Sequence, residues 1–250
     1  MRRFADVDER KFSRMMARFA SEPHANPGWE YLLKAYAYDE FHGRVTLALR
    51  SEFDPDFLLL HFQSPDWAGH HFLYFHSPDR FAALPTAGML RAKLGSELPF
   101  YGKTVAAFYA YADEWLGRLL EGRDESTGVL VLSDHGMEPD RGPRETGSHN
   151  DGPAGMFVLA GPGIRRGHRL AGATVYDMLP TILAAAGLPV ARDLDGHVLE
   201  DAFAPGALGG AALTYVVTYE TGGRYVPEVE IGSELHDEVE KELRGLGYIQ

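Results

Sequence analysis

The chain has 250 residues, 45% of them hydrophobic, and carries 36 acidic against 24 basic residues, a formal net charge of -12. This length supports one substantial core, and the acidic balance argues against nucleic acid and anionic membranes as partners, although bound metal ions could still attract an anionic substrate. Without cysteine, a signal-peptide pattern or a bilayer-length apolar stretch, the chain has no disulfide or thiolate site and we expect a soluble, cytoplasmic protein.

The N-terminal half of the chain is predicted to contain a lead-in, a helix and a strand. Residues 1–28 are polar and weakly patterned, so we expect a lead-in to a single α/β domain over residues 29–250. Apolar residues recur at helical spacing over residues 29–50. The nearly continuous apolar run at residues 56–62 predicts a strand buried on both faces. Residues 72–98 lose periodicity and are expected to form a small cap-like excursion.

The following elements alternate between helix and strand. Thr174 and Asp177 form a capping-box pattern at the start of one of the helices. Helices alternating with buried strands indicate an α/β fold with a mostly parallel sheet and helices on both faces, in which ligands bind beyond the carboxyl ends of the strands. Helices are predicted for residues 102–120, 175–186 and 233–244, and strands for residues 128–133, 156–160 and 213–218.

Acidic and histidine residues follow two of the predicted strands. Asp66 and His70 are four residues apart, so a helical turn beginning at Pro65 would let them bind one ion together. Taken alone, this pair is better explained by a helix-capping Asp66 with an incidental histidine. Asp134 and His135 directly follow an aliphatic strand, where their burial would be costly without a partner. A metal site is therefore favoured there over a polar strand exit with a capping aspartate.

His149 lies in a polar loop before the next strand, and a lone loop histidine is usually solvated. Its role as a metal ligand is supported only by the other candidates, with which it forms a set of five oxygen and imidazole donors without sulfur. Such a set suits Zn, Mn or Fe and disfavours a thiolate zinc site or an all-oxygen calcium site. Two adjacent divalent ions would point to phosphoryl or sulfuryl transfer.

In their order, these motifs resemble the alkaline phosphatase superfamily, most of all its bacterial type I phosphodiesterase/nucleotide pyrophosphatase branch. The resemblance implies two divalent ions, zinc foremost and Mn or Fe as alternatives. Asp66, His70 and His149 would bind one ion, and Asp134 and His135 the other. The segments that carry the resemblance are residues 55–59, 64–66, 69–70, 131–137, 147–149, 161–164, 175–181 and 243–249.

The sequence departs from the family at its N-terminal end. Family members supply the second ion with an Asp and a nucleophilic Ser or Thr from the N-terminal half, and residues 1–28 contain no comparable strand. No nucleophile is therefore identified, and the chain resembles a C-terminal half that lacks the N-terminal strands.

We accordingly expect a metal-dependent hydrolase of small phosphate esters that is incomplete alone. One ion site would be complete in this chain, and the nucleophile-bearing half would lie on another polypeptide or be lost. One alternative is a non-catalytic metal- or partner-binding remnant that associates with a second polypeptide, or with itself, through an open sheet edge. Another is a sulfatase or phosphomutase of the same superfamily.

Overall fold

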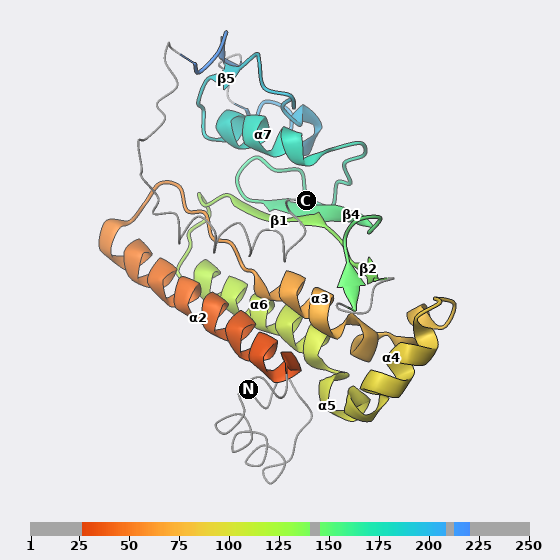
Figure 1. Ribbon diagram of the computed structural model, residues 1–250. Helices are drawn as coiled ribbons and strands as arrows, with labels where there is room; N and C mark the ends of the chain where they lie inside the picture. Colours follow the sequence, from red (N-terminus) through yellow and green to blue (C-terminus); the bar gives the residue numbers. More distant parts are fainter. Residues whose placement is uncertain (1–26, 141–145, 209–212, 221–250) are drawn as a thin grey trace. The chain divides into compact units, whose positions relative to one another are not determined.

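The computed structural model of the chain describes residues 27–140, 146–208 and 213–220, and it divides after Gly167 into two units, each considered by itself below (Figure 1). The lead-in predicted for residues 1–28 lies outside the described residues except for its last two, which begin a helix. The helix predicted for residues 233–244 also lies outside them. The proposed single domain over residues 29–250 stays a prediction.

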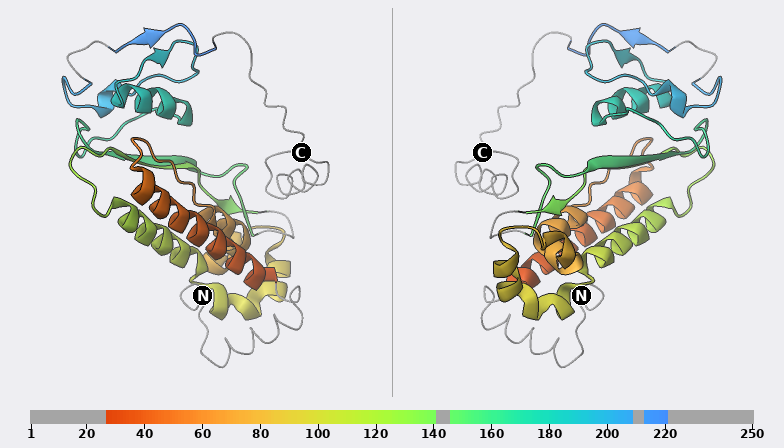
Figure 2. Two further views of the ribbon diagram at one scale, coloured as in Figure 1. Left: turned by 90° about the vertical axis from the view of Figure 1, so that its left-hand side faces the viewer. Right: turned by 90° about the vertical axis from the view of Figure 1, so that its right-hand side faces the viewer.

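A layer of helices forms the body of the first unit, as the ribbon views show (Figure 2). Helix α2, Pro27–Phe53, and helix α6, Thr104–Leu120, confirm the helices predicted for this part of the chain, and α3, Ser64–His76, packs against both. The predicted excursion at residues 72–98 begins inside α3. It continues as short helical elements: η1 Pro78–Phe81, α4 Ala87–Leu94, η2 Gly95–Glu97 and α5 Leu98–Tyr101.

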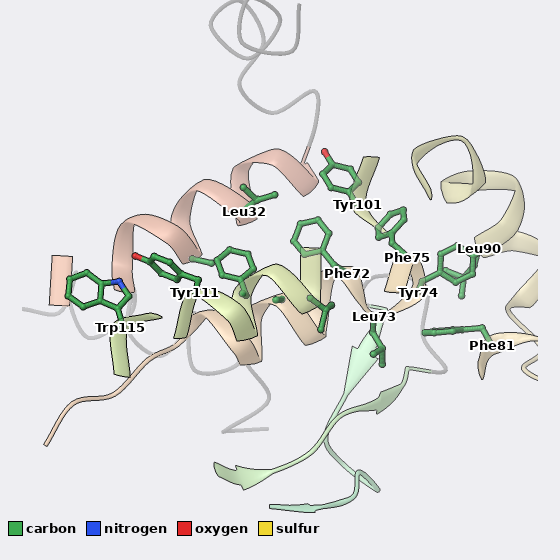
Figure 3. Close-up of a cluster of buried hydrophobic side chains, with 14 residues drawn as sticks. Leu32, Phe72, Leu73, Tyr74, Phe75, Phe81, Leu90, Tyr101, Tyr111 and Trp115 are labelled. Carbon is green, nitrogen blue, oxygen red and sulfur yellow. The ribbon is translucent and has the colours of Figure 1, made fainter. Parts of the chain in front are cut away.

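Aromatic side chains fill the core between these helices (Figure 3). Phe72 of α3, Phe108 and Trp115 of α6 and Leu32 of α2 are all at most 1% exposed. The face of α2 that meets Trp115 carries Gly43, where an added Cβ would lie 2.7 Å from the indole ring. The missing side chain leaves room for the Trp115 ring against α2, so this glycine serves the packing of the core.

The strand predicted for residues 56–62 is wrong. This segment connects α2 to α3 without regular secondary structure, and Phe57 and Leu59 are 63% and 82% exposed. An apolar run becomes a strand only when neighbouring strands pair with its backbone and cover its side chains. The described residues supply no such ladder to this segment.

The strands predicted around residues 128–133 and 156–160 are present as β1, Val129–His135, and β4, Ala154–Ala160. They pair antiparallel, with Val131 opposite Val158. The expectation that both strands are buried is wrong. Leu132 and Val158 are 44% and 51% exposed. Each strand pairs only with the other in the described part of the chain, so no further layer covers these side chains.

The α/β character of the chain is confirmed, but the described residues contain small sheets rather than one mostly parallel sheet. Strands β2, Glu138–Pro139, and β3, Gly147–Ser148, form a second antiparallel pair in the first unit. In the second unit, β5, Val190–Ala191, and β6, Tyr215–Val216, pair in parallel. No helix among the described residues is both long and apolar enough to cross a membrane.

The second unit is built around η3, Val175–Asp177, and α7, Met178–Ala185, which together confirm the helix predicted at residues 175–186. The predicted capping box is also present. The backbone N–H and the hydroxyl of Thr174 both donate to Asp177 Oδ2. A small core of Ala184, Val190 and Val198 joins α7 to β5 and to the segment that leads into η4, Glu200–Ala202.

Candidate metal centre

Helix α3 presents Asp66 and His70 on the same face. The helix starts with Pro65 in its first turn, where a missing N–H costs nothing. One turn separates Asp66 and His70, and Asp66 Oδ1 lies 3.5 Å from His70 Nε2. Both side chains are largely buried, with exposed fractions of 17% and 6%.

The strand β3 fixes the ring of His70. His70 Nδ1 lies 2.9 Å from the Gly147 carbonyl oxygen, to which it donates, and the N–H of Thr146 donates to the His70 carbonyl at 2.7 Å. A side chain at Gly147 would collide with the carbonyl oxygen of Gly69 in α3, so only glycine permits this approach. The contact leaves Nε2 of His70 as the ring nitrogen with a lone pair, and this atom faces Asp66.

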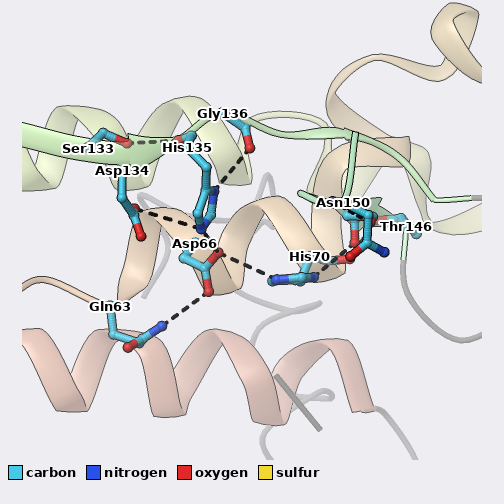
Figure 4. A network of polar contacts seen from close by, with 11 residues as sticks. Gln63, Asp66, His70, Ser133, Asp134, His135, Gly136, Thr146 and Asn150 are labelled. Carbon is cyan, nitrogen blue, oxygen red and sulfur yellow. Dashed lines mark hydrogen bonds and ion pairs between the residues drawn. The ribbon is translucent and has the colours of Figure 1, made fainter. Parts of the chain in front are cut away.

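His135 and His149 reach the same place from the two ends of the segment between β1 and β4. His135 ends β1, its Nδ1 lies 3.1 Å from the Gly136 carbonyl oxygen, and its Nε2 lies 3.8 Å from Asp66 Oδ1 (Figure 4). His149 directly follows β3. Its ring stacks on His135 at a centroid distance of 4.3 Å and meets the edge of His70 at 5.2 Å. Residues far apart in the sequence thus converge on one carboxylate.

The donor set fits a divalent ion. Asp66, His135 and His149 each offer one ligand atom, and these atoms lie within 4.8 Å of one another. Asp66 Oδ1 is buried and accepts no hydrogen bond from the described residues, although two imidazole lone pairs face it. Such lone pairs repel unless a cation or proton lies between them. A tetrahedral site with bonds of about 2.1 Å spaces its ligand atoms by roughly 3.4 Å, close to the 3.5 and 3.8 Å found here.

Asp134 occupies a different environment from the other four candidates. Its side chain is 65% exposed, and its Oδ1 lies 3.8 Å from His135 Nε2. The burial penalty that favoured a metal site at this strand end therefore does not apply to Asp134, because β1 is uncovered there. The carboxylate remains within reach of the centre. The division of the five residues between two ions stays a prediction.

The structure adds residues that the sequence interpretation missed. Gln63 Nε2 donates to Asp66 Oδ2 at 3.1 Å, and Asp39 of α2 accepts the backbone N–H groups at the start of α3. The sequence contained a signal for Asp39, because it shares a helix face with Leu32, Ala35 and Thr46, where a charge requires a partner. No comparable signal pointed to Gln63.

Comparisons with known proteins show the family of the chain. The family described as type I phosphodiesterase/nucleotide pyrophosphatase matches residues 7–148, more than half of the chain. A 2,3-bisphosphoglycerate-independent phosphoglycerate mutase from Cereibacter sphaeroides is 26% identical over 153 residues, which is 59% of this chain and 24% of that protein. The chain thus spans about a quarter of the length of this curated relative. No solved structure matches the chain significantly.

The matched region includes four of the five candidate ligands and ends one residue before the fifth, His149. The resemblance read from the sequence is confirmed by this match. The chain belongs to the type I phosphodiesterase/nucleotide pyrophosphatase family.

Proposed function

We propose that the chain is the metal-binding part of a hydrolase that acts on small phosphate esters. The observation that carries this proposal is the convergence of Asp66, His135 and His149, with His70 beside them, on a space suited to a divalent ion. Membership of a phosphoryl-transfer family supports the same reaction class. Zinc is the ion we propose, because oxygen and imidazole donors at these spacings suit it; Mn and Fe are the alternatives.

The residues of the chain would hold and orient the metal ions rather than take part in the transfer of the phosphoryl group. His70 and His135 keep their Nδ1 atoms engaged with backbone carbonyls, which directs both Nε2 atoms inward. The family resemblance implies that Asp66, His70 and His149 hold one ion and Asp134 and His135 a second, and the 3.8 Å between His135 Nε2 and Asp66 Oδ1 would bring these two ion sites side by side. Divalent ions bound there would supply Lewis-acid stabilisation of charge on phosphoryl oxygens.

We propose that the nucleophile comes from a polypeptide segment other than the described residues. Three hydroxyl groups near the centre have local partners: Ser133 donates to the His135 carbonyl, Thr146 donates to the His70 carbonyl, and Ser148 accepts the Asn150 N–H. Strand β1 also keeps one edge without a partner strand in the described part of the chain. A segment that adds parallel strands to this edge could complete both the mostly parallel sheet and the second ion site.

Metal binding by the purified 250-residue chain tests the centre. We expect titration calorimetry with Zn²⁺ or Mn²⁺ to show about one tightly bound ion, and hydrolysis of bis-p-nitrophenyl phosphate to be negligible, because one ion lacks the two-ion clamp. The variant His149→Ala should lose binding by about 100-fold or more, since it removes a direct ligand. The matched control His76→Ala, an exposed histidine at the end of α3, should bind as the wild type does.

Two results would contradict the proposal in different ways. If the wild-type chain binds no divalent ion, the proposed centre is wrong. If it binds an ion and hydrolyses the diester robustly, the proposal of an external nucleophile is wrong, while the proposed metal centre stands.

A second candidate is phosphate transfer between hydroxyl groups rather than to water. It is supported by the relative, which is a phosphoglycerate mutase. Incubation of a completed assembly with 3-phosphoglycerate would distinguish the two, because a mutase yields 2-phosphoglycerate whereas a hydrolase releases inorganic phosphate.

A third candidate is a non-catalytic module that binds a partner. It is supported by the exposed apolar residues of α2 and the following segment, such as Phe53 and Leu59. Partner binding that survives the loss of His70 and His149 would favour this candidate over an enzyme.

A further inference from the structure

The N-terminus of α3 is capped from another helix. The residue that precedes the helix, Gln63, has helical backbone angles, and no side-chain cap is formed there by the residue itself. Instead, Asp39 of α2 accepts the Gln63 N–H with Oδ1 at 2.9 Å and the Ser64 N–H with Oδ2 at 3.2 Å. Both oxygens of one carboxylate thus satisfy N–H groups that would otherwise lack partners at the start of the helix.

Asp39 is suited to this task by its charge as well as its place. It is fully buried in the face of α2 that packs in the core. Burial raises the pKa of the Asp39 carboxyl, and the hydrogen bonds from Ser64 and Gln63 partly offset that rise. An asparagine in this position would offer only one acceptor oxygen for the two N–H groups.

Because Asp39 caps the helix, the side chain of Gln63 is available for another contact. Gln63 Nε2 donates to Asp66 Oδ2 at 3.1 Å, as the close-up of the centre shows (Figure 4). The two oxygens of Asp66 are therefore distinct. Oδ2 is held by the amide, and Oδ1 faces the Nε2 atoms of His70 and His135.

We propose that Gln63 is a positioning residue that selects Oδ1 of Asp66 as the metal ligand, and that Asp39 anchors Gln63 in the required place. The inference rests on the metal centre proposed above. A ligating carboxylate that rotates freely can present either oxygen or both, whereas a hydrogen bond to one oxygen fixes the plane of the group. The chain of contacts links the packing of α2 against α3 to the orientation of a ligand.

The variant Gln63→Met tests the proposal because it keeps the side-chain length and removes the donor. We expect the dissociation constants for Zn²⁺ and Co²⁺ to rise about 10- to 100-fold, as is usual for partners of metal ligands. The melting temperature of the metal-free chain should stay close to that of the wild type, because the lost contact caps no helix. Glu52→Met, at an exposed position near the end of α2, is the matched control and should change neither quantity.

The visible spectrum of the Co²⁺-loaded chain separates positioning from general stability. Co²⁺ reports the number and geometry of its ligands through its absorption bands. We expect Gln63→Met to shift these bands, because Asp66 can then rotate, whereas Glu52→Met leaves them unchanged. The variant Gln63→Asn has a side chain one methylene shorter, which draws the amide away from Asp66, and we expect it to behave like Gln63→Met.

The anchoring role of Asp39 predicts a graded effect. Asp39→Asn should weaken Zn²⁺ binding less than Asp39→Ala, because the amide retains one of the two acceptors. Asp113→Asn, an exposed carboxylate on α6, is the matched control and should leave binding unchanged.

Wild-type affinity and an unchanged Co²⁺ spectrum in both Gln63 variants, with binding still lost in His149→Ala, would overturn the positioning role and leave the centre standing. Failure of the wild-type chain to bind Zn²⁺ or Co²⁺ would overturn the centre and, with it, this inference.

Discussion

At the level of single residues, Gly43 shows how one absent side chain makes room for an aromatic ring from another helix. A Cβ at this position would lie 2.7 to 2.8 Å from three carbon atoms of the Trp115 ring, and Trp115 is 1% exposed. The ring has little room to move in a core of tightly packed aromatic side chains. The same helix, α2, carries Asp39 four residues earlier, where its carboxylate caps α3.

We therefore expect Gly43→Ala to destabilise the chain, although alanine is the better helix former. The gain in helix propensity is about 1 kcal/mol, and overpacking a rigid core costs about 1–3 kcal/mol. Gly117→Ala in α6 is the matched control, because a Cβ there meets no atom within 4 Å. It should raise the free energy of unfolding, measured in urea. A Gly43→Ala variant as stable as Gly117→Ala would show that α2 and α6 separate easily.

At the scale of elements, the start of α7 depends on a buried carboxylate. Asp177 accepts the Thr174 N–H at 2.7 Å and the His197 N–H at 2.9 Å, and it is 1% exposed. Burial alone would raise the pKa of Asp177. The pKa is nevertheless below its usual value, because the two backbone N–H groups and the Thr174 hydroxyl donate to the carboxylate and His197 lies nearby. The carboxylate thus joins the helix to the loop that contains His197.

A lowered pKa makes the contribution of Asp177 dependent on pH in a defined direction. The stabilisation should be complete above the unfolded pKa of about 3.9 and be lost as the pH falls through the lower folded value. We expect Asp177→Asn to lower the free energy of unfolding by about 1–2 kcal/mol at pH 7. Its difference from the wild type should shrink on acidification below about pH 4. Calorimetric melts at a series of pH values would check this, and a constant difference would contradict it.

At the scale of the whole molecule, apolar side chains remain exposed along α2 and beyond its end. Phe41, Leu49 and Phe53 of α2 are exposed, and the exposed Phe57 and Leu59 follow in the connecting segment. Where exposed apolar side chains gather in one surface, they usually mark an interaction site or a tendency to aggregate.

We expect the isolated chain to self-associate as its concentration rises. The double variant Phe53→Ser with Leu59→Ser should stay monomeric at higher concentration in sedimentation velocity experiments. Its free energy of unfolding should change little, because both side chains are already exposed. By contrast, Leu32→Ser removes a fully buried side chain and should destabilise the chain by about 2–5 kcal/mol. Unchanged association of the double variant would show that other surfaces drive it.

Local patterns were enough to predict the helices and to name the candidate ligand residues. The periodicity of residues 29–50 and 102–120 and the capping box at Thr174 depend on neighbours close in sequence, and all three are present in the structure. The candidate ligands could likewise be named from the sequence, because carboxylate oxygens and imidazole nitrogens are common metal donors. Their convergence on Asp66 depends on the packing of β3 against α3, which the sequence does not encode locally.

Sequence patterns alone indicate an α/β chain of a phosphoryl-transfer family with five candidate ligands. Long-range contacts had to be seen to learn that residues 56–62 form no strand and that β1 and β4 are antiparallel and uncovered. The same holds for the exposure of Asp134 and the contact of Gln63 with Asp66. Helices are easier to predict because a helix satisfies its backbone within itself. A strand, a buried carboxylate and a metal centre each need partners from distant parts of a chain.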